Sequence, residues 1–287
     1  MASPKVTVLV VTYNRPKLIG KAIESAQAQT FKDWELIVVD DSADNATADA
    51  TKPLCAADAR IRYMHRLVRG TIAQASNAGM REAKGEYVAI LDDDDRWLDV
   101  KKLEKQIAFL DAHADYVGCG GGIVAVDAAG AEKFRTFKPE TDEAIRRRAL
   151  YANPMANATT MFRREAAVRA GPHTVPDGVG VGPYDETIQQ FADWDFWLKL
   201  GTMGKLCNFP EYFTTYTMWE QGSSFSKQRE AARAAFRIVH RYRRQYPRYL
   251  FGLGFAVAYF TYAYVPAWLK KFLNAPLSRL KKALFSK

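Results

Sequence analysis

The chain has 287 residues and an ordinary globular composition, 48% hydrophobic and 25% charged, which is enough for one large or two small domains. Its 3 cysteines lie far apart with no CxxC pair, which argues against a disulfide framework or a zinc site and fits a reducing compartment. The net charge of +9 is uneven, because the segment from Lys227 onward carries +13 and the first 226 residues carry −4. A basic tail on a mildly acidic body predicts that the tail alone meets an anionic surface.

The first part of the chain predicts a parallel sheet of strands alternating with helices. Val6–Val11 is a continuous apolar, β-branched run, which indicates a buried strand rather than a signal peptide. Similar runs follow at Glu35–Val39 and Ile61–Met64, with helical spacing of apolar residues between the runs. Because the carboxyl ends of parallel strands share one edge, polar residues that follow the strands should line a ligand site there.

The most informative stretch is Gly85–Trp97, in which an apolar strand, Tyr87–Leu91, runs into four consecutive aspartates, Asp92–Asp95. Neighbouring carboxylates raise each other's pKa, so such a cluster either surrounds a cation or forms a solvated charged loop. Its place at a strand end favours the cation. Oxygen ligands suit Mg²⁺ or Mn²⁺, held by one or two carboxylates and completed by substrate phosphates.

Three features mark the second part of the chain. Gly118–Gly122 has no helix pattern after it, so a bulged or closely approached strand is favoured over a phosphate-binding loop. Pro172–Thr187 is rich in Gly and Pro and predicts a functional or disordered loop, able to act as a lid. Phe191–Leu198 begins a helix, in which Asp193 is either a helix cap or a catalytic group beside that loop; we favour the catalytic role.

The C-terminal segment predicts a membrane-associating region. Lys227–Tyr246 reads as one helix with an arginine every fourth residue, either a solvated face or a contact with acidic lipid headgroups. Tyr249–Leu269 is uncharged and long enough to span a bilayer, but a full crossing would leave basic residues on both sides. We therefore expect an in-plane interfacial anchor. The alternative is packing of this run on the catalytic domain or on a second copy of the chain.

Four segments together resemble family 2 glycosyltransferases: VTVLVVTYNRP, ELIVVDDSADNAT, GEYVAILDDDD and FADWDFWLKL. They fall in the family's usual order and cover about residues 5–225. The resemblance implies the α/β GT-A fold, a single Rossmann-like mixed sheet flanked by helices. It implies a glycosyltransferase domain over 1–226, with a nucleotide-sugar half at 1–115 and an acceptor half at 116–226. Residues 227–287 would form the helical membrane-associating extension.

The resemblance also implies roles for single residues. Asp41 would hydrogen-bond the base, Asp94 would bind the metal, and Asp193 would be the catalytic base. The remaining nucleotide-sugar contacts would come from Thr12, Tyr13, Asn14, Asn77, Asp92 and Asp93, with Asp92 toward the ribose or sugar. The chain departs from the family pattern at Ala192, where many relatives have Glu, and in segment 219–224, which lacks a histidine often found there.

The implied function is inverting transfer of a sugar from a nucleotide-diphosphate sugar, with a UDP-sugar favoured, to a glycan or lipid-linked hydroxyl in cell-surface polysaccharide synthesis. A divalent cation, Mn²⁺ or Mg²⁺, would assist the reaction. The enzyme would work at the cytoplasmic face of the membrane, attached in a peripheral or monotopic manner. A second copy of the chain, in a homodimer, is a further possible partner. We expect no nucleic-acid partner, because the body is acidic and has no aromatic and basic platform. The alternatives are a nucleotidyltransferase and a non-catalytic membrane-bound protein that binds nucleotide sugars.

Overall fold

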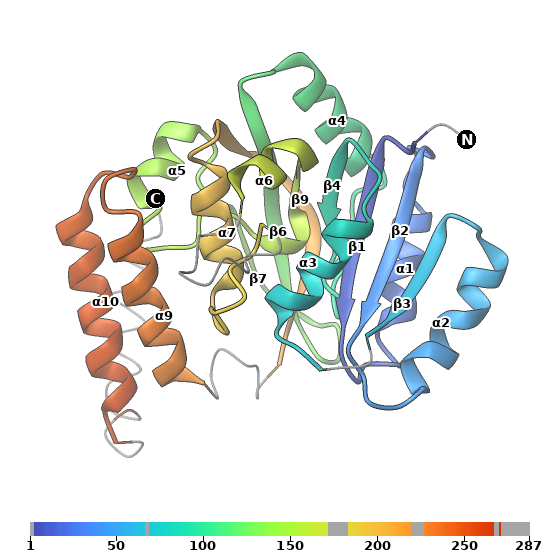
Figure 1. The fold of residues 1–287 in the computed structure, drawn as a ribbon, viewed down its shortest axis with the longest axis horizontal. Helices are drawn as coiled ribbons and strands as arrows, with labels where there is room; N and C mark the ends of the chain where they lie inside the picture. The colour runs from blue at the N-terminus through green and yellow to red at the C-terminus, as the bar shows by residue number, and fades with distance from the viewer. Residues whose placement is uncertain (1–2, 67–68, 172–182, 220–226, 267–269, 271–287) are drawn as a thin grey trace.

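One mixed β-sheet with helices on both faces forms the body of the protein (Figure 1). The computed structural model describes residues 3–66, 69–171, 183–219, 227–266 and 270. The strands are β1 (Val6–Thr12), β2 (Trp34–Asp40), β3 (Ile61–His65), β4 (Tyr87–Ile90), β5 (Arg96–Trp97), β6 (Tyr116–Asp127), β7 (Glu132–Thr136), β8 (Met161–Arg163) and β9 (Lys205–Met218). The helices are α1 (Ile19–Gln27), α2 (Ala46–Ala57), α3 (Ile72–Glu82), α4 (Lys102–Ala112), α5 (Asp142–Arg148), the 3₁₀ turn η1 (Asn157–Thr159), α6 (Arg164–Ala170), α7 (Ala192–Leu200), α9 (Gln228–Arg241) and α10 (Tyr249–Tyr264).

The strand order is β3-β2-β1-β4-β8-β6-β9-β5, with β7 paired to β6. Strands β3, β2, β1 and β4 are parallel, β8 runs antiparallel to both β4 and β6, and β6 and β9 are parallel to each other. The predicted single mixed sheet is therefore present, with a parallel part formed by β3, β2, β1 and β4 and a mixed part formed by the later strands. This arrangement confirms the predicted fold class.

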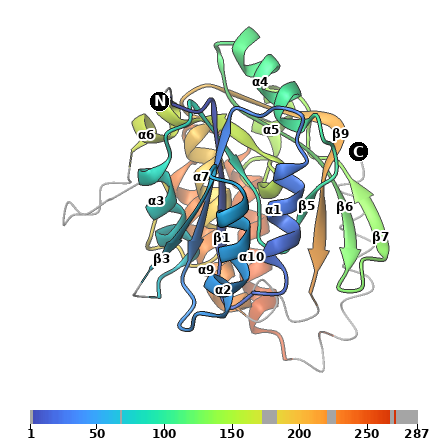
Figure 2. The ribbon, with the colours of Figure 1, turned by 90° about the vertical axis from the view of Figure 1, so that its right-hand side faces the viewer.

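The side chains of β1 alternate between the two faces of the sheet, and each face is covered by its own layer of helices. Val6, Val8 and Val10 pack with α1 and α4 in one buried cluster, and Leu9 faces a second cluster with α3, α7 and α9. Successive strand residues point to opposite faces, so a strand with apolar residues throughout is covered on both sides. Figure 2 shows α1 and α3 on opposite sides of β1.

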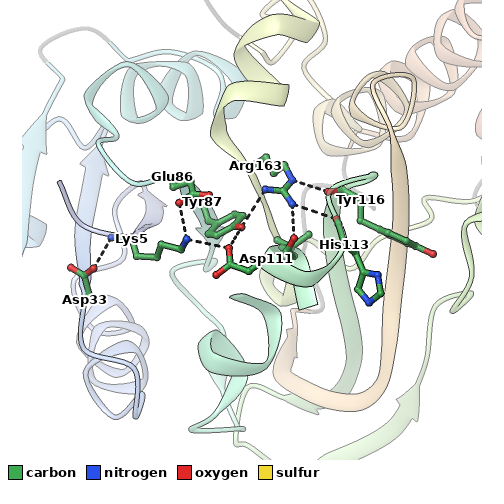
Figure 3. Close-up of polar contacts among 9 residues, drawn as sticks. Lys5, Asp33, Glu86, Tyr87, Asp111, His113, Tyr116 and Arg163 are labelled. Atoms are coloured by element: carbon green, nitrogen blue, oxygen red, sulfur yellow. Dashed lines mark hydrogen bonds and ion pairs between the residues drawn. The ribbon is translucent and has the colours of Figure 1, made fainter. Parts of the chain in front are cut away.

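A polar network ties the two halves together at the amino-terminal edge of the sheet, opposite the predicted site (Figure 3). Lys5 Nζ lies 2.7 Å from Glu86 Oε2, and Tyr87 donates a 2.5 Å hydrogen bond to Asp111 Oδ1. Arg163, at the end of β8, donates to the Tyr87 hydroxyl at 3.2 Å and to the Tyr116 carbonyl at 2.9 Å. This edge therefore has a structural explanation that needs no ligand.

The glycine cluster is part of β6, as predicted, and it lets two strands and their side chains approach closely. The register between β6 and β9 shifts on both sides of Gly122. A Cβ atom at Gly120 would lie 2.5 Å from Asn208 Oδ1, and one at Gly121 would lie 2.5 Å from the Phe213 ring. The bulged, closely approached strand is confirmed.

The C-terminal helices form an antiparallel pair at one end of the molecule, with α10 outermost (Figure 1). Helix α9 shares its buried face with the core of the sheet, through Ala234, Ala235, Ile238 and Val239. The helix ends at Arg241 rather than continuing to Tyr246. No helix in the described part of the chain has both the length and the apolar character needed to cross a bilayer. The boundary at residue 226 and membrane association stay predictions.

In the arginine stripe of α9, Arg229, Arg233 and Arg237 are exposed, as in a solvated face, whereas Arg241 is partly buried in ion pairs. Contact of the stripe with lipid headgroups stays a prediction. Arg241 forms 2.7 Å ion pairs with Asp195, which is fully buried, and with Asp185. Arg237 donates to the Thr187 hydroxyl at 3.0 Å, and Arg233 donates to the Tyr264 hydroxyl at 3.4 Å. The four-residue spacing of the arginines predicts that they share one face of the helix. The acidic partners of Arg241, however, come from another helix and a loop.

Two further expectations change. The sequence of Asn157–Arg163 predicts a single strand, but the structure divides this segment into η1 and the short strand β8. This division puts Asn157 in a turn, where its side chain can reach the acidic cluster. Most of the predicted lid, residues 172–182, lies outside the described residues.

Candidate active site

The predicted site residues gather at the carboxyl edge of the sheet, where β1, β2 and β4 end and α7 begins. The parallel register sets this arrangement, because Thr12 at the end of β1 pairs with Asp40 at the end of β2, and Leu9 pairs with Ile90 at the end of β4. The polar residues that follow these three strands therefore meet above one edge.

The aspartates alternate in their exposure. Asp92 and Asp94 are partly exposed, whereas Asp93 and Asp95 are buried. Asp93 accepts a 2.7 Å hydrogen bond from Thr12 Oγ1, and Asp95 accepts one of 2.9 Å from the Thr217 amide. The cluster thus has two inward carboxylates that connect it to β1 and β9 and two outward ones that are available to a ligand.

Arg15 and Trp219 complete the surroundings of Asp94. Arg15 Nη1 lies 2.8 Å from Asp93 Oδ1 and 2.6 Å from Asp94 Oδ2, so one guanidinium bridges two carboxylates. Trp219 Nε1 donates a 2.7 Å hydrogen bond to the same Asp94 oxygen. Both donors stabilise a negative charge on Asp94.

The pKa values of the cluster reflect its crowding. Burial and, to a lesser extent, the neighbouring Asp94 charge together raise the pKa of Asp92 to about 7. Burial also raises the pKa of Asp93 to about 6, against the opposing effect of Arg15. A site with this much excess negative charge gains stability when a cation binds.

Asp41 keeps one oxygen available at the end of β2. Its Oδ2 accepts a 2.9 Å hydrogen bond from the Gly70 amide. Its buried Oδ1 accepts no hydrogen bond from the described residues, although Arg66 Nη1 lies 3.2 Å away. This oxygen is therefore ion-paired with Arg66 but can still accept a hydrogen bond from an N–H donor such as one on a nucleotide base.

One short segment connects the acidic cluster to the predicted base. Asn157 donates a 3.0 Å hydrogen bond to Asp92 Oδ1, and Asn153 donates one of 2.7 Å to Asp193 Oδ2. Asp193 lies in the first turn of α7, and burial raises the pKa of its carboxyl. Asn157 Oδ1 is buried and accepts no hydrogen bond within the described chain, so it is a second oxygen able to accept from a ligand.

Tyr184 lies beside both acids. It is 5% exposed, and burial raises the pKa of its hydroxyl, with further increases from the Asp193 and Asp92 charges. Asn77 holds this residue in place, because its Nδ2 donates to the Tyr184 carbonyl and its Oδ1 accepts from the Tyr184 amide, each at 2.9 Å. Asn77 thus positions the wall between the two acids, and its predicted direct contact with the nucleotide stays a prediction that these contacts do not favour.

The three residues after β1 differ in what they contact. Thr12 is buried against Asp93, so its hydroxyl supports the cluster. The Tyr13 ring has the Arg69 guanidinium 4.1 Å from its centre. Asn14 is exposed with a φ of 52°, and its backbone N–H donates a hydrogen bond to Ser42 Oγ. Their nucleotide contacts, like that of Asp93, stay predictions.

A divalent cation fits this site only together with a substrate. No group of three or more His, Cys, Asp or Glu side chains in the described ranges could hold a metal ion by itself. Asp94 offers one outward carboxylate, and Mg²⁺ or Mn²⁺ bound by one carboxylate needs further oxygens from phosphates and water. The donor set therefore suits a cation shared between Asp94 and a diphosphate.

The sequence analysis missed five residues of this site, Arg15, Asn153, Asn157, Thr217 and Trp219. Each is polar or aromatic and contacts an aspartate that lies 40 or more residues away in the chain. Segment NPMAN at 153–157 offered one usable signal, since it has two amides in a run predicted to lead into a strand.

Comparison with known proteins agrees with the geometry. The family model described as glycosyl transferase family 2 matches residues 7–170. The putative glycosyltransferase EpsE of Bacillus subtilis is 31% identical over 166 residues, 58% of each chain. The putative teichuronic acid biosynthesis glycosyltransferase TuaG of the same species is 28% identical over 81% of this chain and 86% of its own. A Campylobacter jejuni enzyme named GalNAc(5)-diNAcBac-PP-undecaprenol beta-1,3-glucosyltransferase is 42% identical over 97 residues, 33% of this chain and 31% of its own.

Solved structures share the fold. S. aureus TarS in complex with UDP-GlcNAc superposes with a TM-score of 0.60 at 20% identity, over 82% of this chain and 66% of that one. The mannosyltransferase PcManGT of Pyrobaculum calidifontis, in complex with GDP-Man and Mn²⁺, superposes with a TM-score of 0.60 at 20% identity. The match covers 97% of this chain and 81% of that one. The chain spans 58% of the length of EpsE, and its family match covers more than half of its own residues. This chain belongs to glycosyl transferase family 2.

Proposed function

We propose that the protein is an inverting, metal-dependent glycosyltransferase that moves a sugar from a nucleotide-diphosphate sugar to a hydroxyl of a lipid-linked glycan in cell-surface polysaccharide synthesis. The observation that carries the proposal is the segment that holds Asp92 through Asn157 and Asp193 through Asn153. This segment, residues 153–157, supports a donor site at Asp92 and a base at Asp193, with the anomeric carbon of the donor sugar between them.

The donor would bind along the carboxyl edge. Asp41 Oδ1 would accept from the base, and Asn157 Oδ1 together with Asp92 would accept from hydroxyls of the ribose or sugar. A divalent cation held by Asp94 and the diphosphate would supply Lewis-acid stabilisation of the departing nucleoside diphosphate. The complexes named for the structural neighbours, UDP-GlcNAc and GDP-Man with Mn²⁺, support this donor class. We favour a UDP-sugar as the donor.

Asp193 would act on the acceptor. Its carboxylate would take the proton of the acceptor hydroxyl while the acceptor oxygen forms a bond to the anomeric carbon. The bond from that carbon to the diphosphate oxygen breaks, and the nucleoside diphosphate leaves with the electron pair. Asn153 would fix the orientation of the carboxylate by its 2.7 Å hydrogen bond. A single displacement of this kind inverts the anomeric centre.

We place the enzyme at the cytoplasmic face of the membrane, attached in a peripheral or monotopic manner. The support is the basic segment after Lys227 and the uncharged sequence of α10. The undecaprenol-linked acceptor in the name of the Campylobacter jejuni relative supports a lipid-linked acceptor. A homodimer remains the alternative use of α10.

A panel of UDP-, GDP- and dTDP-sugars tests the proposal. We expect slow hydrolysis of one donor with release of the nucleoside diphosphate in Mn²⁺, and no hydrolysis in excess chelator. Release of a nucleoside monophosphate or pyrophosphate would instead indicate a nucleotidyltransferase. Tight binding of a donor without turnover, in the presence of acceptor lipids, would indicate a non-catalytic binding protein.

A further inference from the structure

The outward face of α10 is apolar along most of its length, and at its end the Tyr264 hydroxyl accepts a hydrogen bond from Arg233. Leu250 is 79% exposed, and Val257 and Tyr264 follow at intervals of seven residues on the same face, 48% and 40% exposed. The helix has no charged residue over its 16 residues. Soluble monomers rarely expose a contiguous apolar surface of this length, so such a face marks an interaction surface.

A basic hollow lies where α10 begins against the end of α5. It encloses about 340 Å³, and three of its lining residues are arginines: Arg147, Arg148 and Arg248. Its lining has no acidic residue; the full set is Ala144, Arg147, Arg148, Tyr151, Arg248, Phe251 and Phe255. Arg147 pairs with Glu143 at 2.8 Å, but both side chains are more than half exposed, so this pair is weak. We call this cavity the arginine hollow.

The walls of the arginine hollow are aromatic and rigid. The Tyr151 ring packs edge-on against Phe251 at 4.9 Å and stacks on Phe255 at 5.5 Å. Gly252 permits this contact, since a Cβ atom there would lie 2.7 Å from the Leu150 carbonyl oxygen. The start of α10 is thus held closely against the segment that follows α5.

A second hollow adjoins the first. It is open and shallow rather than enclosed, with a volume of about 620 Å³, and it is lined by the consecutive residues Arg248, Tyr249, Leu250 and Phe251, so it shares Arg248 and Phe251 with the arginine hollow. Its other lining residues are apolar or aromatic, and it continues onto the outward face of α10 through Leu250. A site for an anion therefore adjoins a site for a hydrocarbon chain.

We propose that the arginine hollow binds the phosphate of an anionic phospholipid, with the acyl chain lying in the second hollow and along the outward face of α10. Arginine provides forked donors that match phosphate oxygens, and the partly exposed aromatic rings of the hollow flank these donors. The assignment deepens the proposed membrane attachment and rests on it. It moves the lipid contact from the arginine stripe of α9 to the junction of α5 and α10.

The position of the hollow links the membrane to the active site. Tyr151 lies two residues before Asn153, which holds Asp193, and the Ala149 carbonyl accepts a 2.7 Å hydrogen bond from Trp194 of α7. A lipid bound in the arginine hollow would therefore set the distance of the predicted base from the bilayer. This arrangement suits an acceptor that is itself anchored in the membrane.

The test uses short-chain lipids as monomers, so that general adsorption to a charged surface does not contribute. Dihexanoyl phosphatidylglycerol is titrated below its critical micelle concentration into the full-length protein, and heat is measured. Dihexanoyl phosphatidylcholine and inorganic phosphate are titrated in parallel. We expect the anionic lipid to bind at least about tenfold more tightly than either, because only it has both a net negative headgroup and acyl chains.

Variants locate the binding. Arg248→Gln and Arg148→Gln are each expected to weaken binding about fivefold, the effect of one cationic side chain near an anionic lipid. Leu250→Ser should weaken binding of the lipid and leave that of inorganic phosphate unchanged. Arg244→Gln is the control, since it removes the same charge from the exposed turn between α9 and α10 but does not line the hollow. Thermal unfolding confirms that each variant is folded.

Three results would overturn the assignment. The first is that the two lipids bind with equal affinity. The second is that Arg244→Gln lowers the affinity for the anionic lipid as much as Arg248→Gln does. The third is that light scattering shows a stable dimer, which Leu250→Ser dissociates. The last result assigns the α10 face to a second copy of the chain. Hydrolysis of soluble donor is measured on the same variants. Retained hydrolysis with lost lipid binding separates this proposal from the proposed catalysis.

Discussion

Asp193→Asn is expected to lower kcat by about 10²–10⁴-fold, the usual contribution of a positioned general base, with little change in nucleotide affinity. Asparagine keeps the shape of the side chain and can still accept from Asn153, but it cannot take a proton from the acceptor. The measurement is single-turnover transfer to a lipid-linked acceptor, together with titration of the nucleoside diphosphate. Near-normal kcat in this variant would remove Asp193 from the base assignment.

Asp195→Asn provides the matched comparison on the same helix turn. Asp195 is fully buried and pairs with Arg241, so its replacement should lower the melting temperature and leave kcat of the folded protein largely unchanged. The Asp193 variant should show the opposite pattern. If both variants lose activity only in proportion to lost folded protein, the two aspartates share a structural role.

The pH dependence of kcat has a predicted direction. The base must be deprotonated to act, and burial raises the pKa of Asp193 above that of an ordinary aspartate. Activity should therefore fall on acidification at a pH above the usual aspartate pKa of about 3.9. The Asp193→Asn variant should lose the part of this acid limb that Asp193 causes, whereas any part caused by Asp92 and Asp93, with pKa values of about 7 and about 6, should remain.

Asp94→Asn is expected to abolish metal-dependent binding of the nucleoside diphosphate while the protein stays folded. The loss should exceed the about 10–100-fold decrease typical of replacing an outer-shell partner, because Asp94 would contribute a direct oxygen ligand. Calorimetric titration of UDP in Mn²⁺ and in chelator measures the effect. Asp44→Asn, an exposed carboxylate just after β2, is the control for the change in charge.

Two outcomes would contradict the role of Asp94. One is undiminished turnover of the wild-type protein in excess chelator, which would remove the cation from the reaction. The other is normal metal-dependent binding in the Asp94→Asn variant, which would place the cation on another carboxylate. Asp92 would then be the next residue to replace, since it is the other outward carboxylate of the cluster.

The fold could be predicted to the extent that it depends on local pattern. Val6–Val11, Glu35–Val39 and Tyr87–Leu91 are mostly apolar, and each lies in or next to a buried strand of the parallel part of the sheet. The acidic residues that follow them converge because parallel strands end at a common edge. The alternating exposure of Asp92–Asp95 was not predictable in this way, because these residues form a turn in which the Asp95 amide donates to the Asp92 carbonyl at 3.1 Å.

The rest depends on contacts between distant segments, which local pattern does not encode. Arg15 follows the first strand, but its two carboxylate partners lie 78 and 79 residues away. The arginine stripe of α9 has the spacing of a solvated or lipid-facing surface, and only the folded chain brings Arg241 to Asp195. In both cases a charge that the sequence leaves unpaired is neutralised by tertiary structure.

The anomeric configuration of the first product tests the central claim most directly. Hydrolysis of an α-linked nucleotide sugar by the wild-type protein with Mn²⁺ is followed by ¹H NMR before the released sugar mutarotates. A single displacement assisted by Asp193 predicts that the β-anomer forms first and that the Asp193→Asn variant forms it far more slowly. First formation of the α-anomer would contradict the single displacement, and equal rates in both proteins would contradict the assignment of the base.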